Sequence, residues 1–287
     1  MRKLLYLVTE DWSVVSHFLP MVRTAVAAGF EVVVATRLRE HGARIEAEGC
    51  RVVALENERS SLGSPEMFRG FARIWRILRD ERPDVVHCIS LRMVVLGGIA
   101  ARLQGVKWLV LAPIGLGHLW LKNNVFEDAA RGLSRHIVGR WLRGPGTRYM
   151  FENTEDPAEF GLDAGKSPVT IVPGAGVDPR DFPPSPDPPS PPLKVAVVSR
   201  MIEAAASGRP IVTTNAPGCR DLVRDGHEGI LVPLRDTEAA ARALVELSRD
   251  ADLRARLGRA AHARFQERFT EAEVRRAVAS VYSGFQV

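Results

Sequence analysis

Short apolar runs rich in β-branched residues alternate with amphipathic stretches along the first part of the chain. Several runs are apolar throughout, which predicts parallel strands buried on both faces. The alternation therefore predicts an α/β fold with a doubly wound parallel sheet and right-handed crossovers. The predicted strands are residues 3–9, 30–36, 51–55, 84–88, 107–112, 147–151 and 169–172. The predicted helices between them are residues 16–28, 39–48, 65–81, 91–104 and 126–143.

Helix boundaries are marked by residues with suitable capping chemistry. Gly29, Gly49 and Gly105 each follow a predicted helix, where glycine at positive φ ends the helix. Ser90 precedes a predicted helix and is a suitable N-cap. The segment 270–273 (TEAE) has the capping-box pattern and predicts the start of the last helix.

A proline-dense segment divides the chain at residues 183–193. Such proline density excludes a helix or a central strand and favours an extended spacer. We therefore predict a first Rossmann-like domain over residues 1–182 and a second over 194–287. The second series has predicted strands at 194–199, 210–214 and 229–232, and predicted helices at 203–207, 217–224, 236–248, 250–268 and 271–284. With three strands against seven, the second domain is expected to be truncated.

Charge and cysteine content narrow the class of protein. The net charge is +5, but no arginine stripe is interleaved with aromatic residues, so nucleic acid is not an expected partner. Cys50, Cys88 and Cys219 are odd in number and widely spaced, which predicts reduced thiols in a cytoplasmic protein. No stretch approaches the ~18 apolar residues that can span a bilayer. We expect a soluble protein, or one peripheral to the inner face of the cell membrane.

Several motif matches are rejected on their context. Residues 161–167 (GLDAGKS) resemble a phosphate-binding P-loop but precede a strand, whereas a P-loop opens a helix. Gly115 and Gly117 lack the third glycine of a dinucleotide fingerprint and follow the fifth strand instead of the first. The seven histidines show no metal-ligand spacing, and no G-x-S-x-G elbow is present. The sequence therefore predicts no cofactor, no metal site and no hydrolase triad.

Three histidines lie near predicted strand ends. His17 opens the first helix, His87 closes the fourth strand, and His118 lies in the glycine loop after the fifth strand with Gly115 and Gly117. Open α/β sheets bind ligands at the carboxyl ends of their strands, so each histidine is a candidate site residue. A hydrogen-bonded structural histidine is the alternative for each of them.

Three further candidates lie around the second domain. Gly176 lies in a turn before the linker, where either a turn at positive φ or a position at the hinge accounts for a glycine. Arg200 ends the first predicted strand of that domain, where a guanidinium is suited to clamp a diphosphate. Glu203 follows at the start of a helix, where interaction with the helix macrodipole is the alternative role.

Together these segments resemble the retaining glycosyltransferases of family 4, which have the GT-B fold. The resemblance covers nearly the whole chain and depends on order and spacing. It is carried by His87 and by residues 113–118, 151–156, 172–178, 198–201, 203–210 and 225–233. The nearest type is that of bacterial enzymes that build capsular, exopolysaccharide or O-antigen units on a lipid carrier.

The resemblance implies a role for each domain. The first would bind a lipid-linked or saccharide acceptor, and the second a nucleotide-sugar donor, usually UDP-linked, without a metal. Arg200 matches the family's diphosphate-binding arginine, and Glu203 matches the second glutamate of its E-x7-E motif, which holds the ribose hydroxyls. His118 lies in the loop that faces the transferred sugar and is the implied catalytic residue. The implied acceptor-side residues are His17, His87, Gly115, Gly117 and Gly176.

The chain departs from the family pattern at the junction between Arg200 and Glu203. The lysine that normally follows the arginine is absent, and the first glutamate of E-x7-E falls on Val195. The strands that normally separate the two residues are also absent, on the order of 90 residues if the domains were once of equal size. We therefore predict impaired sugar transfer. The alternatives are an inactive homologue that acts as a binding or scaffolding subunit, and a nucleotide-sugar epimerase.

Peripheral membrane contact is a further hypothesis for the predicted helix 65–81. Its arginines lie beside apolar residues, an arrangement that suits an anionic lipid surface. The alternative is an ordinary amphipathic helix packed on the sheet, which is the usual meaning of this spacing.

Overall fold

We describe the protein from a computed structural model that defines residues 1–55, 65–116, 125–185 and 201–285. The chain forms two compact units. The first unit comprises Met1–Val172 together with Arg275–Val287, and the second unit comprises Pro173–Val274. This division differs from the boundary expected at the proline-dense segment, because the end of the chain returns to the first unit.

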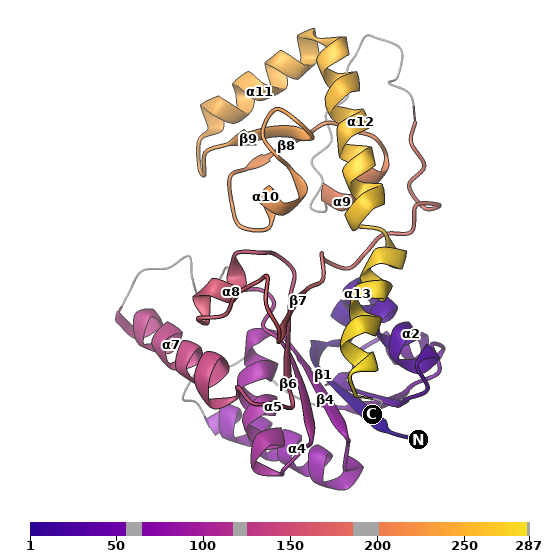
Figure 1. The fold of residues 1–287 in the computed structure, drawn as a ribbon, viewed down its shortest axis with the longest axis vertical. Coiled ribbons are helices and arrows are strands. Elements are labelled where there is room, and N and C mark those ends of the chain that lie inside the picture. The colour runs from indigo at the N-terminus through magenta and orange to yellow at the C-terminus, as the bar shows by residue number, and fades with distance from the viewer. Residues whose placement is uncertain (56–64, 117–124, 186–200, 286–287) are drawn as a thin grey trace. The chain divides into compact units, whose positions relative to one another are not determined.

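The first unit is built on a seven-stranded parallel sheet in the order β3-β2-β1-β4-β5-β6-β7 (Figure 1). Its strands are β1 (Lys3–Glu10), β2 (Glu31–Arg37), β3 (Arg51–Ala54), β4 (Val85–Ile89), β5 (Trp108–Ala112), β6 (Thr147–Phe151) and β7 (Val169–Ile171). All seven predicted strands are confirmed. Because β1 lies beside β4, the direction of winding reverses between these two strands.

Helices cover both faces of this sheet, with α4 and α5 on one face and α2 and the C-terminal helix on the other (Figure 1). They are α1 (Asp11–Ser13), the π-helical η1 (Val14–Phe18), α2 (Leu19–Ala27), α3 (Gly42–Glu46), α4 (Pro65–Glu81), α5 (Leu91–Leu103), α7 (Val125–His136), the π-helical η2 (Ile137–Trp141), α8 (Asp156–Glu159) and α13 (Glu271–Ser283). The predicted glycine caps are confirmed, because Gly29, Gly49 and Gly105 all have positive φ. Ser90 caps α5 as predicted, with its Oγ accepting the Met93 N–H at 3.4 Å.

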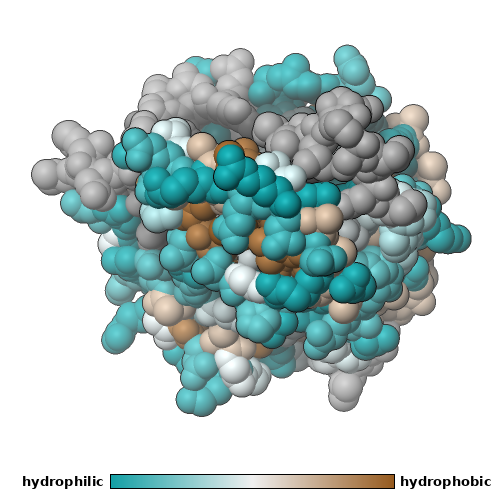
Figure 2. All heavy atoms as spheres, turned by 90° about the horizontal axis from the view of Figure 1, so that it is seen from above, coloured by the Kyte–Doolittle hydropathy of each residue, from teal (hydrophilic) through white to brown (hydrophobic). Residues whose placement is uncertain are grey.

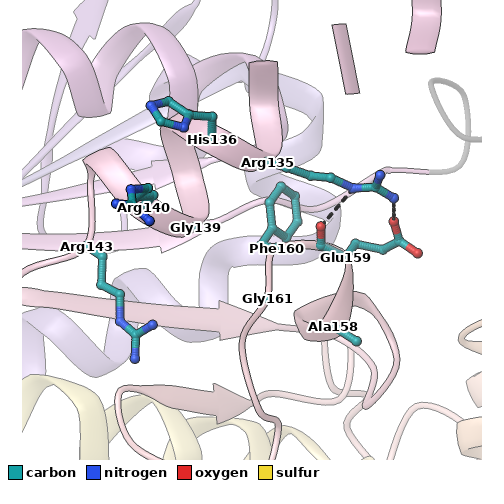
Figure 3. Close-up of a pocket in the computed structure, with 9 residues that line it drawn as sticks. All are labelled: Arg135, His136, Gly139, Arg140, Arg143, Ala158, Glu159, Phe160 and Gly161. Atoms are coloured by element: carbon teal, nitrogen blue, oxygen red, sulfur yellow. Dashed lines mark hydrogen bonds and ion pairs between the residues drawn. The ribbon is translucent and has the colours of Figure 1, made fainter. Parts of the chain in front are cut away.

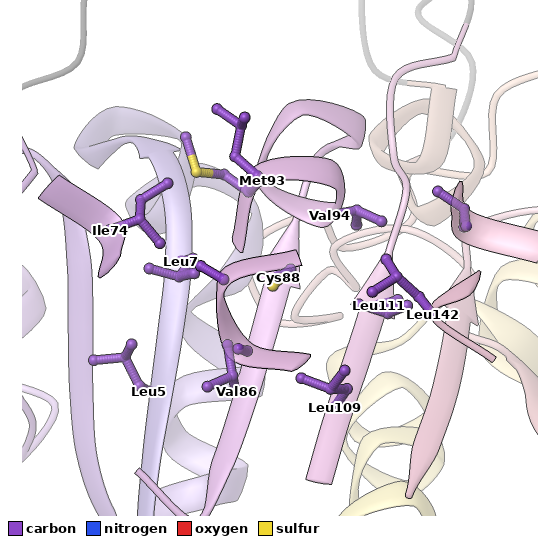
Figure 4. Close-up of a cluster of buried hydrophobic side chains, with 14 of the residues drawn as sticks. Leu5, Leu7, Ile74, Val86, Cys88, Met93, Val94, Leu109, Leu111 and Leu142 are labelled. Atoms are coloured by element: carbon purple, nitrogen blue, oxygen red, sulfur yellow. The ribbon is translucent and has the colours of Figure 1, made fainter. Parts of the chain in front are cut away.

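The main core lies on the face covered by α4 and α5 (Figure 4). Successive residues of a strand point to opposite faces, so alternate positions of three strands meet these helices. These positions are Leu5 and Leu7 of β1, Val86 and Cys88 of β4, and Leu109 and Leu111 of β5. Helix α5 approaches β1 closely at Gly97, because this residue has no Cβ. A Cβ there would lie 2.4 Å from Leu7 Cδ1.

Helix α4 uses its apolar face for this core. Ile74 is fully buried, and Phe71 and Trp75 pack against the cluster, whereas Phe68 is 69% exposed. The packing on the sheet confirms the reading of an ordinary amphipathic helix. The apolar face that membrane contact through this helix would need is therefore occupied, apart from Phe68.

The second unit contains a two-stranded parallel sheet among its described residues. Its elements are α9 (Met201–Ala206), β8 (Ile211–Thr214), α10 (Cys219–Leu222), β9 (Gly229–Val232), α11 (Thr237–Arg249), α12 (Ala251–Arg268) and the start of α13. Two of the three predicted strands are thus confirmed, and the third, 194–199, lies outside the described residues. The unit is tightly built, since a Cβ at Gly229 would lie 2.0 Å from Ile211 O.

Hydrophilic side chains cover most of the face drawn in Figure 2, with apolar residues in small separate areas. Exposed apolar residues of the second unit include Leu234, Leu244 and Val245. Within the described ranges, no helix combines the length and apolar character needed to cross a membrane.

Candidate functional site

The carboxyl ends of β1 and β4 lie side by side where the strand order reverses. In open parallel sheets the crossovers leave in opposite directions at such a point and open a crevice in which ligands bind. Thr9 Oγ1 and Ser90 Oγ lie 3.0 Å apart here, so a hydrogen bond joins the two strand ends. We call this place the switch point and define it by Thr9, Trp12, His17, Ser90 and Arg92.

Ser90 holds a strained backbone conformation at the switch point. Its φ of 87° and ψ of 150° belong to a region that is essentially reserved for glycine, at a cost of about 1–3 kcal/mol. The surrounding structure holds it there, because its N–H donates to Ala112 O at 3.0 Å and its C=O accepts from the Val94 N–H at 2.9 Å. Strain of this kind concentrates at binding and catalytic sites.

A buried carboxylate organises the loops beside the switch point. Asp11 follows β1 and is fully buried. Its Oδ2 accepts the backbone N–H groups of Arg39, Glu40 and His41 at 2.7, 3.1 and 3.0 Å. Burial alone would raise the pKa of Asp11, but these backbone hydrogen bonds hold that pKa below its usual value. The loop after β2 is therefore tied to the end of β1.

His17 lies in η1, inside the helical segment that begins at Asp11 after β1, and does not open that segment as expected. It is half-buried in η1, with Nδ1 2.6 Å from Ser16 Oγ. Its ring centroid lies 6.4 Å from that of Trp12, whose side chain is 47% exposed. Arg92 is half-buried in the first turn of α5, and burial lowers its pKa. Thr9, Trp12 and Arg92 are not among the predicted site residues, because only the strand order brings them together.

His87 corrects the sequence-based expectation. It lies in the middle of β4, not at its end, and it is fully buried. It alternates with Val86 and Cys88 and so faces α13, where its Nδ1 lies 2.8 Å from the Tyr282 hydroxyl. Burial lowers the pKa of His87 to about 3. The structural role that was the alternative therefore accounts for this residue, and a ligand at the sheet edge cannot reach it.

The edge beyond β5 and β6 carries one further titratable group. Gly115 follows β5, is exposed and has a φ of 81°. Glu152 follows β6 and is half-buried, and burial followed by repulsion from Asp156 raises its pKa to about 7. The sequence analysis included Glu152 only as part of the segment 151–156. Gly117 and His118 lie outside the described residues.

Gly176 in the second unit is explained by close packing. Its φ is 71°, and a Cβ there would lie 2.9 Å from Glu271 Cα. The next residue, Val177, donates its N–H to Phe269 O at 3.1 Å and accepts from the Glu271 N–H at 3.0 Å. The positive φ and the close packing therefore account for a glycine at this position. Among the described residues of the unit, none of the other predicted site residues contacts it.

Glu203 lies in the first turn of α9 with one carboxylate oxygen buried. Arg200, its expected partner in donor binding, lies outside the described residues. The segment 225–233 folds as a tight loop before and within β9, where Asp225 Oδ1 accepts the Leu231 N–H at 2.9 Å. Glu228 in this loop is buried and bonded to Arg224, so the pair has a structural role.

Acidic, histidine and cysteine side chains do not gather in the described residues into any group of three or more that would suit a metal ion. The three cysteines are free thiols, as the sequence predicts.

Solved structures share this architecture across both units. Anabaena Alr3699/HepE in complex with UDP-glucose matches with a TM-score of 0.71 and 14% identity, covering 99% of this chain and 100% of that chain. Sucrose-phosphate synthase from Thermosynechococcus elongatus matches with a TM-score of 0.74 and 14% identity, covering 99% of each chain. At this identity the similarity concerns the fold alone. The class of protein is thus the α/β GT-B fold, as the sequence predicts.

Sequence matches narrow this class to a family. The family model for "Glycosyl transferase 4-like" matches residues 3–142, and that for "Glycosyl transferases group 1" matches residues 195–250. The sequence matches and the fold together support a relationship to the GT-B glycosyltransferases of the group 1 and 4-like type.

Curated relatives match shorter segments. D-inositol 3-phosphate glycosyltransferase of Streptomyces bingchenggensis (strain BCW-1) is 44% identical over 82 residues, which is 29% of this chain and 18% of the relative. Lipopolysaccharide core biosynthesis glycosyltransferase LpsE of Rhizobium meliloti (strain 1021) is 37% identical over 62 residues, 22% of this chain and 18% of the relative. The matched region thus spans less than a fifth of the length of these relatives.

Proposed function

We propose that this protein derives from, and retains part of the machinery of, an enzyme that transfers a sugar from a UDP-sugar to a lipid-linked or saccharide acceptor. The observation that carries the proposal is the pair of family matches, one along the first unit and one within the second. Support for the donor comes from the structural neighbour that holds UDP-glucose. The name of the Rhizobium relative, a lipopolysaccharide core biosynthesis glycosyltransferase, supports a place in cell-surface polysaccharide synthesis. A location on the cytoplasmic side of the membrane is part of the same proposal.

The proposed division of labour places the acceptor at the switch point of the first unit. The exposed Trp12 ring offers a surface on which a sugar can stack, and Thr9, His17 and Ser90 offer hydrogen-bonding groups. His118 would face the transferred sugar. Because no metal is proposed, protein cations must stabilise the departing diphosphate.

Donor binding is assigned to Arg200 and Glu203. The guanidinium of Arg200 would hold the diphosphate, and the carboxylate of Glu203 would hold the ribose hydroxyls. The lysine and the first glutamate of the family pattern are absent, and Val195 stands in the place of that glutamate. Removing one such clamp commonly costs ~3 kcal/mol of transition-state stabilisation, so we propose that sugar transfer is impaired.

The test is calorimetric titration of the full chain with UDP. Micromolar binding is expected for the wild type, with a loss of at least about tenfold in Arg200→Ala and a smaller loss in Glu203→Gln. The matched control is Arg249→Ala, which removes an exposed arginine at the end of α11 and is expected to bind UDP as the wild type does.

A folded chain that binds no UDP would contradict the donor-site proposal. In that case the scaffolding hypothesis, which the missing lysine and glutamate favour, predicts co-purification with a full-length glycosyltransferase. Neither family match describes an epimerase, and we do not propose that activity.

A further inference from the structure

A basic pocket lies among the helices of the first unit, beside α7, η2 and α8 (Figure 3). Its volume is about 650 Å³. Its lining side chains come mainly from the end of α7, from η2 and from the turn after α8. Four of them are basic, namely Arg135, His136, Arg140 and Arg143, whereas Glu159 is the single acidic residue in the lining.

The single carboxylate is already used. Arg135 donates from Nε to Glu159 O at 3.0 Å, and its terminal nitrogen pairs with the Glu159 carboxylate. This pair joins α7 to α8 and occupies one end of the pocket in Figure 3, while Arg140 and Arg143 lie toward the other. Neither Arg140 nor Arg143 makes a hydrogen bond or an ion pair with the described residues, and both are exposed.

A third guanidinium adds to this concentration of positive charge. Arg102 lies against Gly144, where an added Cβ would meet its NH1 at 2.9 Å. Arg102 and Arg143 both act on the buried Tyr149 and oppose the rise in its pKa that burial causes. The one carboxylate of the lining is paired with Arg135, so Arg102, Arg140 and Arg143 repel one another, and a bound anion would reduce that repulsion.

The backbone that carries these arginines is well anchored. The Val138 and Leu142 carbonyls accept the Tyr149 hydroxyl at 2.6 Å and the Thr147 hydroxyl at 2.7 Å. Gly139 lies directly against the turn after α8, because a Cβ there would lie 2.1 Å from Phe160 O. The arginines therefore extend from a fixed frame, which lowers the entropic cost of binding.

We propose that this pocket binds the phosphate group of a phosphoester, held by Arg140 and Arg143. Planar guanidinium groups match the oxygens of a phosphate in pairs, which favours phosphate over a simple halide. The lining residues belong to the end of α7, to η2 and to α8 with the turn that follows it, and none of them is a residue of the switch point, so the two places are separate. The exposed Leu133 and Trp141 lie on the same helical segment and would suit a phosphate presented by a lipid headgroup as well as a soluble one.

The test uses two probes, glycerol 3-phosphate in solution and vesicles of phosphatidylcholine with and without phosphatidylglycerol. The test variant is Arg140→Gln with Arg143→Gln, and the matched control is Arg44→Gln with Arg275→Gln. The control pair removes two exposed arginines from α3 and α13 of the same unit, so the net charge changes equally. Unchanged circular dichroism and thermal midpoint establish that both variants fold.

Loss of glycerol 3-phosphate affinity by at least about tenfold in the pocket variant alone supports the proposal. Additional loss of binding to phosphatidylglycerol vesicles identifies the headgroup as the source of the phosphate, and unchanged vesicle binding identifies a soluble source. Equal behaviour of wild type and pocket variant with both probes overturns the proposal. An equal loss in the Arg44 and Arg275 control also overturns it, because the effect would then be one of general charge.

Discussion

A chain of buried hydrogen bonds fastens α13 to the first unit's sheet, and its central member is Tyr282. The Tyr282 hydroxyl lies 2.5 Å from that of Tyr6 and 2.8 Å from His87 Nδ1, and the Tyr6 hydroxyl donates to Met21 O at 3.0 Å. Each tyrosine has one proton to give. Tyr282 must therefore donate to Tyr6, and His87 must donate from Nδ1 to Tyr282.

This proton count sets the expected effect of Tyr282→Phe. The variant leaves the Nδ1–H of His87 buried without an acceptor among the described residues, and such a donor costs about 1–3 kcal/mol. We expect a loss of about 2 kcal/mol in the free energy of unfolding. In a His87→Leu background no donor is orphaned, so the same substitution should cost about 1 kcal/mol or less.

Urea denaturation of the four chains of this double-mutant cycle measures the coupling. All five tryptophans belong to the first unit's sequence, so their fluorescence reports on that unit. We expect a coupling free energy of at least about 1 kcal/mol between Tyr282 and His87. A coupling below about 0.5 kcal/mol would refute the directional chain of hydrogen bonds.

Three further predictions test separate parts of the structure. Burial lowers the pKa of His87 from 6.5 to about 3, so between these pH values the unfolded chain takes up a proton that the folded chain excludes. As the pH falls through this range, the wild type should therefore lose as much as about 4 kcal/mol more of its free energy of unfolding than His87→Leu does. Acid denaturation of the two chains measures this difference. Burial raises the pKa of Glu152 from 4.5 to about 7, so ionisation of this side chain at higher pH destabilises the folded state. The free energy of unfolding of Glu152→Gln should equal that of the wild type near pH 4.5 and exceed it by about 1–2 kcal/mol at pH 8, a figure reduced for the partial exposure of the side chain. Equal stability of the two chains at pH 8 would contradict this prediction. Gly139→Ala should lower the free energy of unfolding by at least about 2 kcal/mol, because the new Cβ would lie 2.1 Å from Phe160 O. The control is Gly132→Ala in α7, where nothing lies within 4 Å of the new Cβ. It should raise the free energy of unfolding by about 0.5–1 kcal/mol in the same urea assay.

Local patterns were sufficient for the elements of this fold. All seven strands of the first unit were predicted because buried parallel strands are apolar throughout, whereas apolar residues recur about every 3.6 residues in the helices between them. The helix ends marked by Gly29, Gly49 and Gly105 were predicted because positive φ is a property of the residue itself. The α/β class follows from signals of this local kind, whereas the GT-B fold was implied by the resemblance to the family 4 glycosyltransferases.

Positions that depend on contacts between distant segments were not predicted in this way. The assignment of His87 to a strand end was wrong, since the sequence does not show that Tyr282, 195 residues away, lies against its ring. Nor does spacing along the chain show that Thr9 and Ser90 share a hydrogen bond, because strand order decides which strand ends meet.

The sequence by itself therefore determined the elements, the fold class and the residue types available for binding. The tertiary structure alone decided which of those residues meet, which are buried, and where arginines gather around a pocket whose one carboxylate is already paired. The physical reason is that backbone propensity and hydrophobic periodicity act over a few residues, whereas burial, hydrogen-bond pairing and pKa depend on groups that the fold brings together from far along the chain.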